Sequence, residues 1–307
     1  REGGFTHLIS PRCGEVLLRS YSTLTVTPAR DYIHPCVPNQ ISYQFMVTGE
    51  IFGPFKLIRP IGHGGMGSVH LAEDASGRRI ALKLVPEHLS KNEMFRKRFQ
   101  RECAIIHRLS HPGIPRFYEQ GEHAGRLFLT MEYVEGWSLE WLMQNQPDQI
   151  SFDWTRSVML AVAGILVHAH AEGVIHRDIA PKNILLTAEG DVKLIDFGIS
   201  KVADEVTLTM TGQHFGTPAY MAPEHFEQGT VSAASDLWSL GVVGFRMLTG
   251  RMPYTAENDM ALIQQIINPQ LSAMPALDAN PAAPPDLARV VDRLLQKDPS
   301  HRYANAG

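Results

Sequence analysis

The chain has 307 residues, of which 44% are hydrophobic and 20% are charged. These values are typical of an ordinary globular protein with one large or two ordinary domains and a substantial core. The formal net charge of -4 gives no indication of a nucleic-acid-binding surface, so we expect no nucleic acid among its partners.

Two further features limit the class of protein. The longest apolar stretch, Val158–Val167, is shorter than the roughly 20 residues that span a membrane, so we expect a buried helix there. Cys13, Cys36 and Cys103 lack metal-ligand spacing, and their odd number argues against a disulfide framework. No signal peptide is recognised at the start of the sequence. We therefore expect a cytoplasmic protein with no membrane segment within this chain.

The first 45 residues differ from the rest. They mix Pro, Ser, Thr and Arg with scattered aromatic residues and show no sustained period of 2 or 3.6. The first methionine is Met46, and the sequence changes character within a few residues of it. We predict that residues 1–45 lie outside the folded domain, with Met46 as the natural start, and that the domain covers residues 46–307.

Short strands come first in the predicted domain, and helices follow. Strands are predicted at Phe55–Ile61, Ser68–Glu73 and Ile80–Val85, and two more are expected to end at Tyr118 and Val134. Helices are predicted at Asn92–Leu109, Asp153–Glu172, Ser235–Thr249 and Pro285–Gln296. This order indicates an α+β fold with two lobes, a β-rich N-lobe of about residues 55–134 and an α-rich C-lobe of about residues 135–307, with a cleft between them.

The first chemical motif is the glycine-rich segment Gly62–Val69. Gly62, Gly64 and Gly67 have the spacing that lets backbone N–H groups approach phosphate oxygens without interference from a Cβ atom. The same spacing occurs in dinucleotide folds, where it opens a helix. Here it joins two predicted strands, which favours the phosphate-binding loop of kinases.

The next strand ends at Lys83. In isolation this residue could be a solvated lysine at a strand end, but it could also bridge two phosphates of ATP. A buried cation of that kind needs an anionic partner. Glu102 lies one turn before Ile106, on nearly the same side of the predicted helix as its apolar residues. We therefore expect an ion pair between Lys83 and Glu102.

The third group consists of Asp178, Asn183 and Asp196, which stand in the sequences HRDIAPKN and DFG on either side of a predicted hairpin. Phosphoryl transfer depends chiefly on positioning and charge neutralisation. Asp178 would orient an attacking hydroxyl and receive its proton. Asn183 and Asp196 offer oxygen ligands to Mg²⁺, which prefers such ligands. Two Asp-containing turns beside a hairpin would explain either motif alone, but not both in this order.

Together these motifs resemble those of protein kinases over about residues 55–307, and the glycine loop is most similar to bacterial eukaryotic-like (Hanks-type) Ser/Thr kinases. Met131–Val134 resembles the hinge, with the backbone of Glu132 and Val134 facing adenine. The resemblance implies an ATP site that draws on both lobes: Gly62, Gly64, Gly65, Gly67, Val69, Ala81, Lys83, Met131, Glu132, Val134 and Leu185.

Three matches beyond the hinge carry further implications. Gly216–Glu224 resembles the end of an activation segment. Asp236 resembles the residue of a central helix that caps the backbone of the catalytic loop. Arg302 belongs to a segment that resembles the last family motif, which implies a buried ion pair between Glu224 and Arg302. The sequence ends soon after this motif, so a truncated C-terminus is expected, and a full-length protein could be anchored to a membrane through the missing part.

One position departs from the family pattern. Ala180 stands where Ser/Thr kinases usually carry lysine, and Lys182 stands where tyrosine kinases often have arginine. Thr217, in a Gly-Thr-x-x-Tyr context, is a feature of Ser/Thr kinases and is expected to contact Asp178 and Lys182. We predict a Ser/Thr kinase in which Lys182 contacts the transferred phosphoryl group.

The sequence leaves two alternatives to an ATP- and Mg²⁺-dependent protein kinase. One is a pseudokinase that acts as a nucleotide-binding scaffold, and the other is a small-molecule phosphotransferase. The intact residues Lys83, Glu102, Asp178, Asn183 and Asp196 disfavour the first, and the activation-segment motif disfavours the second. The expected partners are protein substrates with Ser/Thr acceptors and a second copy of the chain for autophosphorylation in trans.

Regulation is predicted at Thr209 and Thr211, which resemble an autophosphorylated pair in bacterial relatives. A phosphate adds about -1.5 to -2 charges and needs cations to order the segment that carries it. Arg177 and Lys201 stand where phosphorylation-dependent kinases supply such cations. A threonine-rich loop with incidental basic neighbours is the simpler alternative.

Overall fold

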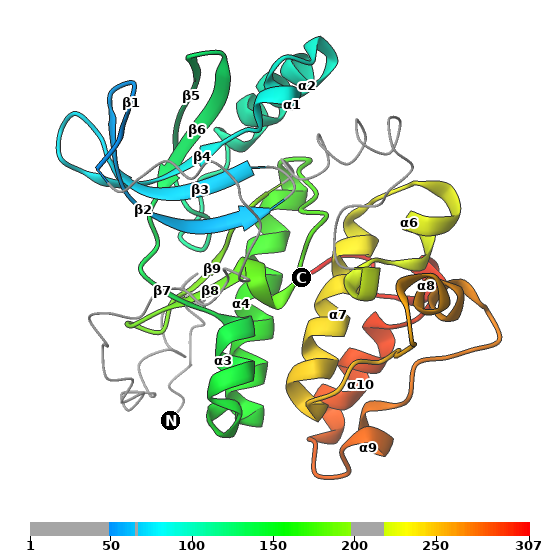
Figure 1. Cartoon of the computed structure of the whole chain (residues 1–307). Helices are drawn as coiled ribbons and strands as arrows, with labels where there is room; N and C mark the ends of the chain where they lie inside the picture. The colour runs from blue at the N-terminus through cyan, green and yellow to red at the C-terminus, as the bar shows by residue number, and fades with distance from the viewer. Residues whose placement is uncertain (1–48, 65–66, 198–217) are drawn as a thin grey trace, which may run out of the picture.

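The N-terminal lobe is an antiparallel sheet with two helices beside it, as the computed structural model of residues 49–64, 67–197 and 218–307 shows (Figure 1). Its strands pair in the order β1-β2-β3-β4-β6-β5. They are β1 (Ile51–Phe52), β2 (Phe55–Gly64), β3 (Gly67–Glu73), β4 (Arg79–Leu84), β5 (Phe117–His123) and β6 (Arg126–Glu132). The helices are α1 (Glu87–Ser90) and α2 (Glu93–Ile106).

The first three predicted strands are confirmed as β2, β3 and β4, but the strand predicted to end at Tyr118 is wrong. Strand β5 begins at Phe117 and continues to His123, and a tight turn at Ala124 and Gly125, both with positive φ, joins it to β6. All seven residues of β5 are partly or fully exposed, because β5 is an edge strand of the sheet. An edge strand needs no alternating apolar pattern, so no periodic signal in the sequence marks β5.

Helix α2 has a clear start and a clear buried face. The Asn92 side chain caps the helix by accepting a hydrogen bond from the Phe95 N–H at 2.9 Å. The buried face consists of Phe95, Phe99, Cys103 and Ile106 at helical spacing. Glu102 is only half-buried, because it precedes Cys103 and lies beside this face.

The C-terminal lobe is mainly helical, which confirms the bilobal α+β prediction. Its helices are α3 (Leu139–Asn145), α4 (Phe152–Ala171), α6 (Pro223–Gln228), α7 (Ala233–Thr249), α8 (Asp259–Ile267), α9 (Ala276–Ala279) and α10 (Pro285–Leu294). Short 3-10 turns are η1 (Pro147–Gln149), η2 (Pro181–Asn183), η3 (Pro218–Tyr220) and η4 (Pro299–His301).

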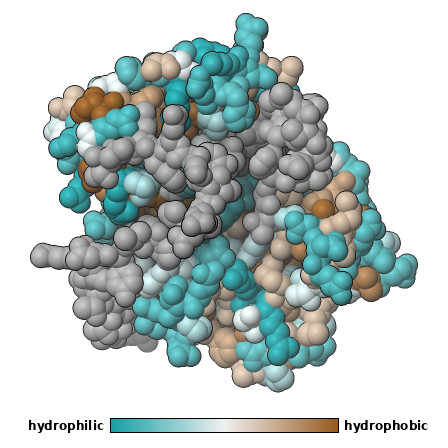
Figure 2. All heavy atoms as spheres, in the orientation of Figure 1, coloured by the Kyte–Doolittle hydropathy of each residue, from teal (hydrophilic) through white to brown (hydrophobic). Residues whose placement is uncertain are grey.

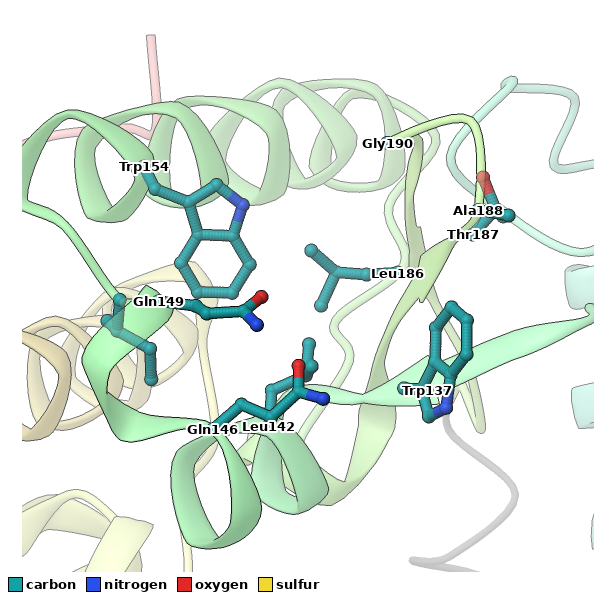
Figure 3. A pocket seen from close by; sticks show the side chains of 10 residues that line it. Trp137, Leu142, Gln146, Gln149, Trp154, Leu186, Thr187, Ala188 and Gly190 are labelled. Carbon is teal, nitrogen blue, oxygen red and sulfur yellow. The ribbon is translucent and has the colours of Figure 1, made fainter. Parts of the chain in front are cut away.

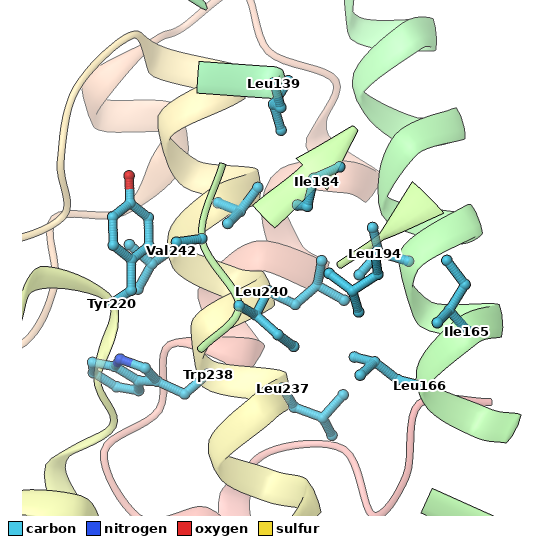
Figure 4. Close-up of a cluster of buried hydrophobic side chains, with 14 of the residues drawn as sticks. Leu139, Ile165, Leu166, Ile184, Leu194, Tyr220, Leu237, Trp238, Leu240 and Val242 are labelled. Atoms are coloured by element: carbon cyan, nitrogen blue, oxygen red, sulfur yellow. The ribbon is translucent and has the colours of Figure 1, made fainter. Parts of the chain in front are cut away.

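Helix α7 is the centre of this lobe. It packs against both α4 and α10, and most of its side chains are buried, as Figure 4 illustrates for Leu237, Trp238 and Leu240. A Cβ atom at Gly244 would lie 2.7 Å from the Met159 side chain of α4. Glycine at this position therefore lets the two helices approach closely, and the rigid α7 can support the loops in front of it.

A small sheet joins the helical lobe to the functional loops. Its strands pair in the order β7-β8-β9 and are β7 (Gly136–Ser138), β8 (Ile184–Thr187) and β9 (Val192–Leu194). Ile184 lies opposite Leu194 in the antiparallel hairpin. Asn183 directly precedes β8 and Asp196 follows β9, so the hairpin brings these two residues to the same end.

The described surface has no obvious large apolar area on the face shown in Figure 2, where hydrophobic residues are scattered among hydrophilic ones. Met260, with 68% of its surface exposed, is the most exposed of the large hydrophobic residues that the structure describes. Among the helices in the described part of the chain, none combines the length and apolarity needed to cross a membrane.

Candidate active site

The catalytic loop is held by a carboxylate from the central helix. Asp236 of α7 is almost completely buried and accepts the backbone N–H groups of His176 and Arg177, each at 2.9 Å. The ring of His170, at the end of α4, lies 2.8 Å from the same carboxylate. Arg177 has a φ of 73°, a conformation that non-glycine residues adopt only when their surroundings enforce it. The prediction that Asp236 caps this loop is confirmed.

His176 connects the catalytic loop to the segment that follows β9. Its Nε2 atom donates to the Ile195 carbonyl oxygen at 2.8 Å, and its Nδ1 atom accepts from the Asp178 N–H at 3.3 Å. Its ring packs edge-on against Phe197, with centroids 4.5 Å apart. Because His176 is fully buried, these contacts fix the distance between the two segments that carry Asp178 and Asp196.

The Asp178 carboxylate has two polar neighbours. Asn183 Nδ2 donates to Asp178 Oδ2 at 2.9 Å and to the Asp178 carbonyl oxygen at 2.7 Å. Lys182 Nζ lies 3.2 Å from the same Oδ2 atom, and 42% of the Lys182 side chain is exposed. The structure thus brings these three predicted residues together. The Lys182 ammonium lies beside the Asp178 carboxylate, which is expected to receive a proton.

Lys83 reaches the C-terminal lobe from β4. Its side chain is largely buried, and Nζ donates to Asp196 Oδ1 at 2.7 Å. Burial opposes ionisation of Asp196, but the charge and hydrogen bond of Lys83 outweigh it and lower the pKa of this carboxyl group. Asp196 has a φ of 64°, so the backbone of this segment is held in a conformation that its side chain disfavours.

The expected ion pair between Lys83 and Glu102 is absent from this conformation. Among the described residues, the ion pair of Lys83 is with Asp196. The physical reason is that Glu102 lies beside the buried face of α2 and remains half-exposed, so its carboxylate does not reach Lys83 Nζ. The neighbouring Cys103 is buried, which raises the pKa of its thiol to about 12 and makes it a poor nucleophile.

Strand register places four predicted nucleotide-site residues on one face of the N-terminal sheet. Val69 lies opposite Lys83, and Ala81 lies opposite Met131. Directly opposed residues share a face of the sheet, and so do residues two apart in one strand. The Val69, Ala81, Lys83 and Met131 side chains therefore project to the same side, from which Lys83 reaches Asp196.

Gly67 is required by the packing of the sheet as well as by any phosphate. Its φ is 113°, and a Cβ atom there would lie 1.9 Å from the Leu84 carbonyl oxygen. At Gly62 the nearest atom to a Cβ would be 3.7 Å away, and at Gly64 the space is open. The close approach of β3 to β4 thus explains Gly67 without a ligand, whereas Gly62 and Gly64 have no such packing reason.

The hinge segment follows β6 and is tied to the C-terminal lobe through Glu132. The Glu132 N–H donates to the Arg116 carbonyl oxygen at 2.8 Å, and its side chain pairs with Lys193 of β9 at 2.9 Å. The Val134 N–H has no acceptor among the described residues. The same holds for the Tyr133 and Glu135 N–H groups, so Val134 carries one of three hinge amides that remain available to a ligand. Leu185 in β8 lies opposite Lys193 and is half-buried.

The predicted ion pair between Glu224 and Arg302 is confirmed. Arg302 Nη1 and Nη2 donate to the two Glu224 oxygens at 2.8 and 2.9 Å, and both residues are buried. The guanidinium also donates to three backbone carbonyl oxygens, those of Ala234, Gln296 and Lys297. The pair therefore anchors the residues after Tyr220 to α7 and the end of the chain.

Three further predicted residues, Gly65, Thr209 and Thr211, and the expected contact of Thr217 lie outside the described residues, as do residues 1–45. Sequence reasoning missed His170, whose only signal was a histidine-rich helix end, which usually reflects the helix dipole. It also missed the ion pair between Lys193 and Glu132, because no local pattern links residues so far apart.

The chain belongs to the protein kinase family: the model of the protein kinase domain matches residues 55–306. It is 38% identical over 262 residues to the serine/threonine-protein kinase PknD of Mycobacterium tuberculosis, covering 85% of this chain and 39% of PknD. It is 34% identical to the serine/threonine-protein kinase PrkC of Bacillus subtilis, covering 85% of this chain and 40% of PrkC. The chain thus spans about two fifths of the length of these relatives.

A solved structure agrees with this assignment. The kinase domain of Mycobacterium tuberculosis PknI is similar with a TM-score of 0.67 and 27% identity, covering 85% of this chain and 96% of that domain. The bilobal fold is therefore a kinase fold, and residues 55–306 form a domain similar to those of bacterial Ser/Thr kinases.

Proposed function

We propose that this chain is an ATP- and Mg²⁺-dependent kinase domain that phosphorylates Ser/Thr hydroxyls of proteins. The observation that carries the proposal is the convergence of Lys83 and Asp196 at 2.7 Å with Asp178, Lys182 and Asn183 grouped on the neighbouring loop. Both lobes contribute to this group, as a nucleotide bound between the glycine loop and the catalytic loop requires.

The donor chemistry of the site fits Mg²⁺. Asn183 uses its Nδ2 atom for Asp178, which leaves Oδ1 as the atom that can ligate a cation. Asp196 accepts from Lys83 through Oδ1, and its second oxygen is the natural ligand. Mg²⁺ prefers such oxygen ligands together with phosphate oxygens, and when bound it neutralises the charge of the phosphates.

The proposed reaction follows from these positions. The Asp178 carboxylate accepts the proton of the Ser/Thr hydroxyl while the hydroxyl oxygen bonds to the γ-phosphorus of ATP and the bond to the ADP oxygen breaks. Lys182 lies beside Asp178 and supplies positive charge where the transferred group passes. Lys83 orients the nucleotide phosphates, and Gly62 and Gly64 give them access to backbone N–H groups. The Val134 N–H would meet the adenine.

Autophosphorylation of Thr209 and Thr211 is part of the proposal. Arg177 supports it, because its Nε atom is buried and has no hydrogen-bond partner among the described residues. A buried guanidinium donor of this kind is satisfied by an incoming anion. A second copy of the chain, acting in trans, would transfer the phosphoryl group to these threonines.

A direct test is incubation of the purified chain with γ-labelled ATP, Mg²⁺ and a generic protein acceptor, followed by phosphoamino-acid analysis. We expect labelled phosphoserine and phosphothreonine, loss of label with EDTA, and loss with Asp178→Asn. Binding of ATP without transfer would identify a nucleotide-binding scaffold instead. Labelled phosphotyrosine alone would contradict the assigned acceptor.

A further inference from the structure

Two histidine rings meet where the loop after α2, residues 107–114, contacts α4. His111 lies in this loop and His168 lies in the last turn of α4, and their ring centroids are 5.3 Å apart. Neither residue belongs to the proposed catalytic or nucleotide-binding group. The pair is also distinct from the cavity shown in Figure 3, which borders the first turn of α4 at Trp154, near the opposite end of this helix.

The 107–114 loop attaches α2 to the C-terminal lobe. Its first residues continue the hydrogen bonding of α2, since the Leu109 N–H donates to the carbonyl oxygen of the last α2 residue at 3.0 Å. The Gly113 carbonyl oxygen accepts the Leu194 N–H of β9 at 2.8 Å, and a Cβ atom at Gly113 would lie 2.4 Å from the Ile165 side chain of α4. Ile165 and Leu194 belong to one buried cluster (Figure 4). A shift of this loop therefore moves the end of α2 relative to that cluster.

The conformation of the loop requires a neutral His111. Its Nδ1 atom accepts the Gly113 N–H at 3.0 Å, so the proton of the neutral ring is on Nε2. A second proton can bind only at Nδ1, where it would replace an acceptor with a donor that faces the Gly113 N–H. Protonation therefore breaks this hydrogen bond and leaves the N–H group of the buried Gly113 without its acceptor, which costs free energy.

The charged groups that face His111 also oppose a second proton. In the described part of the chain they are His168 of α4 and Lys193 of β9, and no carboxylate is among them. Lys193 is itself paired with Glu132 of β6, and the buried Nε2 atom of His168 has no hydrogen-bond partner among the described residues. Burial, and then the charges of His168 and Lys193, lower the pKa of His111. The His111 ring is only half-buried, so solvent can still deliver a proton.

We propose that His111 is a proton-sensitive latch, which holds the 107–114 loop and the end of α2 on the C-terminal lobe. At neutral pH the ring is neutral, its bond to Gly113 is intact and α2 is anchored beside β9 and α4. In acid, a proton on Nδ1 breaks the bond and the new charge repels His168 and Lys193, so the loop loosens. The latch itself does not rest on the proposed kinase function, whereas its effect on activity does.

The loop lies between two elements that carry groups of the proposed active site. Helix α2 carries Glu102, the candidate partner of Lys83, and β9 leads directly to Asp196. Once the loop is released, local opening at the end of α2 becomes easier, because fewer contacts hold this end in place. Loosening should therefore disturb the position of Glu102 and lower kinase activity in acid.

The pH range of the latch follows from proton linkage. The folded chain binds the His111 proton more weakly than the unfolded chain, so stability decreases as the pH falls from about 6.5 to the lowered folded pKa and is unaffected above this range. His111→Asn removes the titration, and the asparagine oxygen can accept the Gly113 N–H two residues on, as in an Asx turn. His88→Asn is the matched control, since it makes the same change at an exposed histidine of α1.

Thermal unfolding and hydrogen exchange test the latch without any assay of activity. Between pH 7.5 and 5.5, the melting temperatures of the wild type and His88→Asn should each fall at least about 2 °C more than that of His111→Asn. At pH 5.5, peptides covering residues 107–116 should exchange at least about threefold faster in the wild type than in His111→Asn, with no difference at pH 7.5 and none in α10. The same pH dependence in the wild type and His111→Asn would overturn the latch.

A titration of the wild type keeps the latch testable if His111→Asn does not fold. The NMR signals of the His111 ring and of the Gly113 amide should share one midpoint below the ordinary value of about 6.5, and a midpoint at or above it would overturn the latch. In assays with ATP, Mg²⁺ and a protein acceptor, the wild type should lose at least about threefold more kcat/KM than His111→Asn between pH 7.5 and 5.5. Equal losses would overturn the effect on activity. Proton-dependent exchange without any phosphoryl transfer would support the latch and overturn the kinase function.

Discussion

Lys83 Nζ lies 2.7 Å from Asp196 Oδ1, and this ion pair connects β4 of the N-terminal lobe to the segment after β9 in the C-terminal lobe. In the proposed function, Lys83 orients the phosphates of ATP and Asp196 is a ligand of Mg²⁺. In the structure, each group satisfies the charge of the other. Ligand binding would release Lys83 from Asp196 and allow it to gain Glu102 as a partner.

The first prediction concerns Glu102. Because this residue has no ion-pair partner among the described residues in the present conformation, Glu102→Gln should leave the nucleotide-free melting temperature within about 2 °C of wild type. If Glu102 joins Lys83 during turnover, kcat/KM should fall at least about tenfold, the value of one charge-assisted hydrogen bond.

Glu93→Gln provides a matched control. It removes a carboxylate from the same helix, but at an exposed position in the first turn of α2. It should leave kcat/KM unchanged. A Glu102→Gln variant with wild-type kcat/KM would show that α2 does not contribute its carboxylate to catalysis.

The second prediction concerns the buried pair of Glu224 and Arg302. Arg302→Leu removes five hydrogen bonds and leaves the Glu224 carboxylate buried without its cation. Loss of one partner of a buried pair typically costs about 3–5 kcal/mol, so the melting temperature should fall by more than about 6 °C. Glu224→Gln keeps the shape and one acceptor oxygen and should cost less. Thermal unfolding followed by circular dichroism measures both.

The same pair should make stability depend on pH. Burial opposes ionisation of Glu224, but the hydrogen bond and charge of Arg302 outweigh it and lower the pKa of this carboxyl group. A lowered carboxyl pKa stabilises the fold above the ordinary value of about 4.3, and this contribution is lost as the pH falls through the folded value. The stability difference between wild type and Glu224→Gln should therefore be full at pH 6 and shrink below about pH 4. A constant difference would rule out a role for the charge.

These residues also show what the sequence could predict. Asp236, Glu224 and Arg302 each stand in a motif whose neighbours fix their place, so their contacts were predicted correctly. Strand β5 was misplaced because an edge strand does not need an apolar pattern. The ion-pair partner of Lys83 could not be derived. Both Asp196 and Glu102 are candidate carboxylates, and the choice depends on how the two lobes and α2 are positioned relative to each other.

The third prediction concerns Lys182. Its ammonium lies 3.2 Å from Asp178 Oδ2 and is partly exposed, so it can move toward a phosphoryl group. Loss of one such charge in a transition state costs roughly 2.7–4 kcal/mol. Lys182→Ala should therefore lower kcat about a hundredfold or more with little change in the KM for ATP.

Lys182→Arg is the control, because it keeps the cation and should retain more activity than the alanine variant. Steady-state kinetics with ATP varied at saturating acceptor separates kcat from KM. An alanine variant within threefold of wild type would show that Lys182 is a surface residue without a catalytic role.

The fourth prediction concerns residues 1–45, whose sequence lacks the periodicity of a folded segment. A chain that begins at Met46 should have nearly the same melting temperature and activity as the full chain. A decrease beyond a few degrees would correspond to more than about 1 kcal/mol of lost packing in a domain of this size, and would show that the segment packs against the domain.

The last prediction is that phosphorylation of Thr209 and Thr211 switches the kinase on. Each phosphate adds about -1.5 to -2 charges, and Arg177 offers a buried Nε donor without a partner among the described residues, next to the catalytic Asp178. Pairing of phosphate with Arg177 would tie the segment before Thr217 to the catalytic loop that Asp236 holds in place. The chain incubated with ATP and Mg²⁺ should carry phosphate at both threonines by peptide mass mapping. The Thr209→Ala/Thr211→Ala variant should lose most activity toward a protein acceptor. The Arg177→Ala variant should still be phosphorylated, but phosphorylation should raise its activity little. Full activity of the double alanine variant, or turnover by a chain that stays unmodified at both threonines, would show that this switch does not exist.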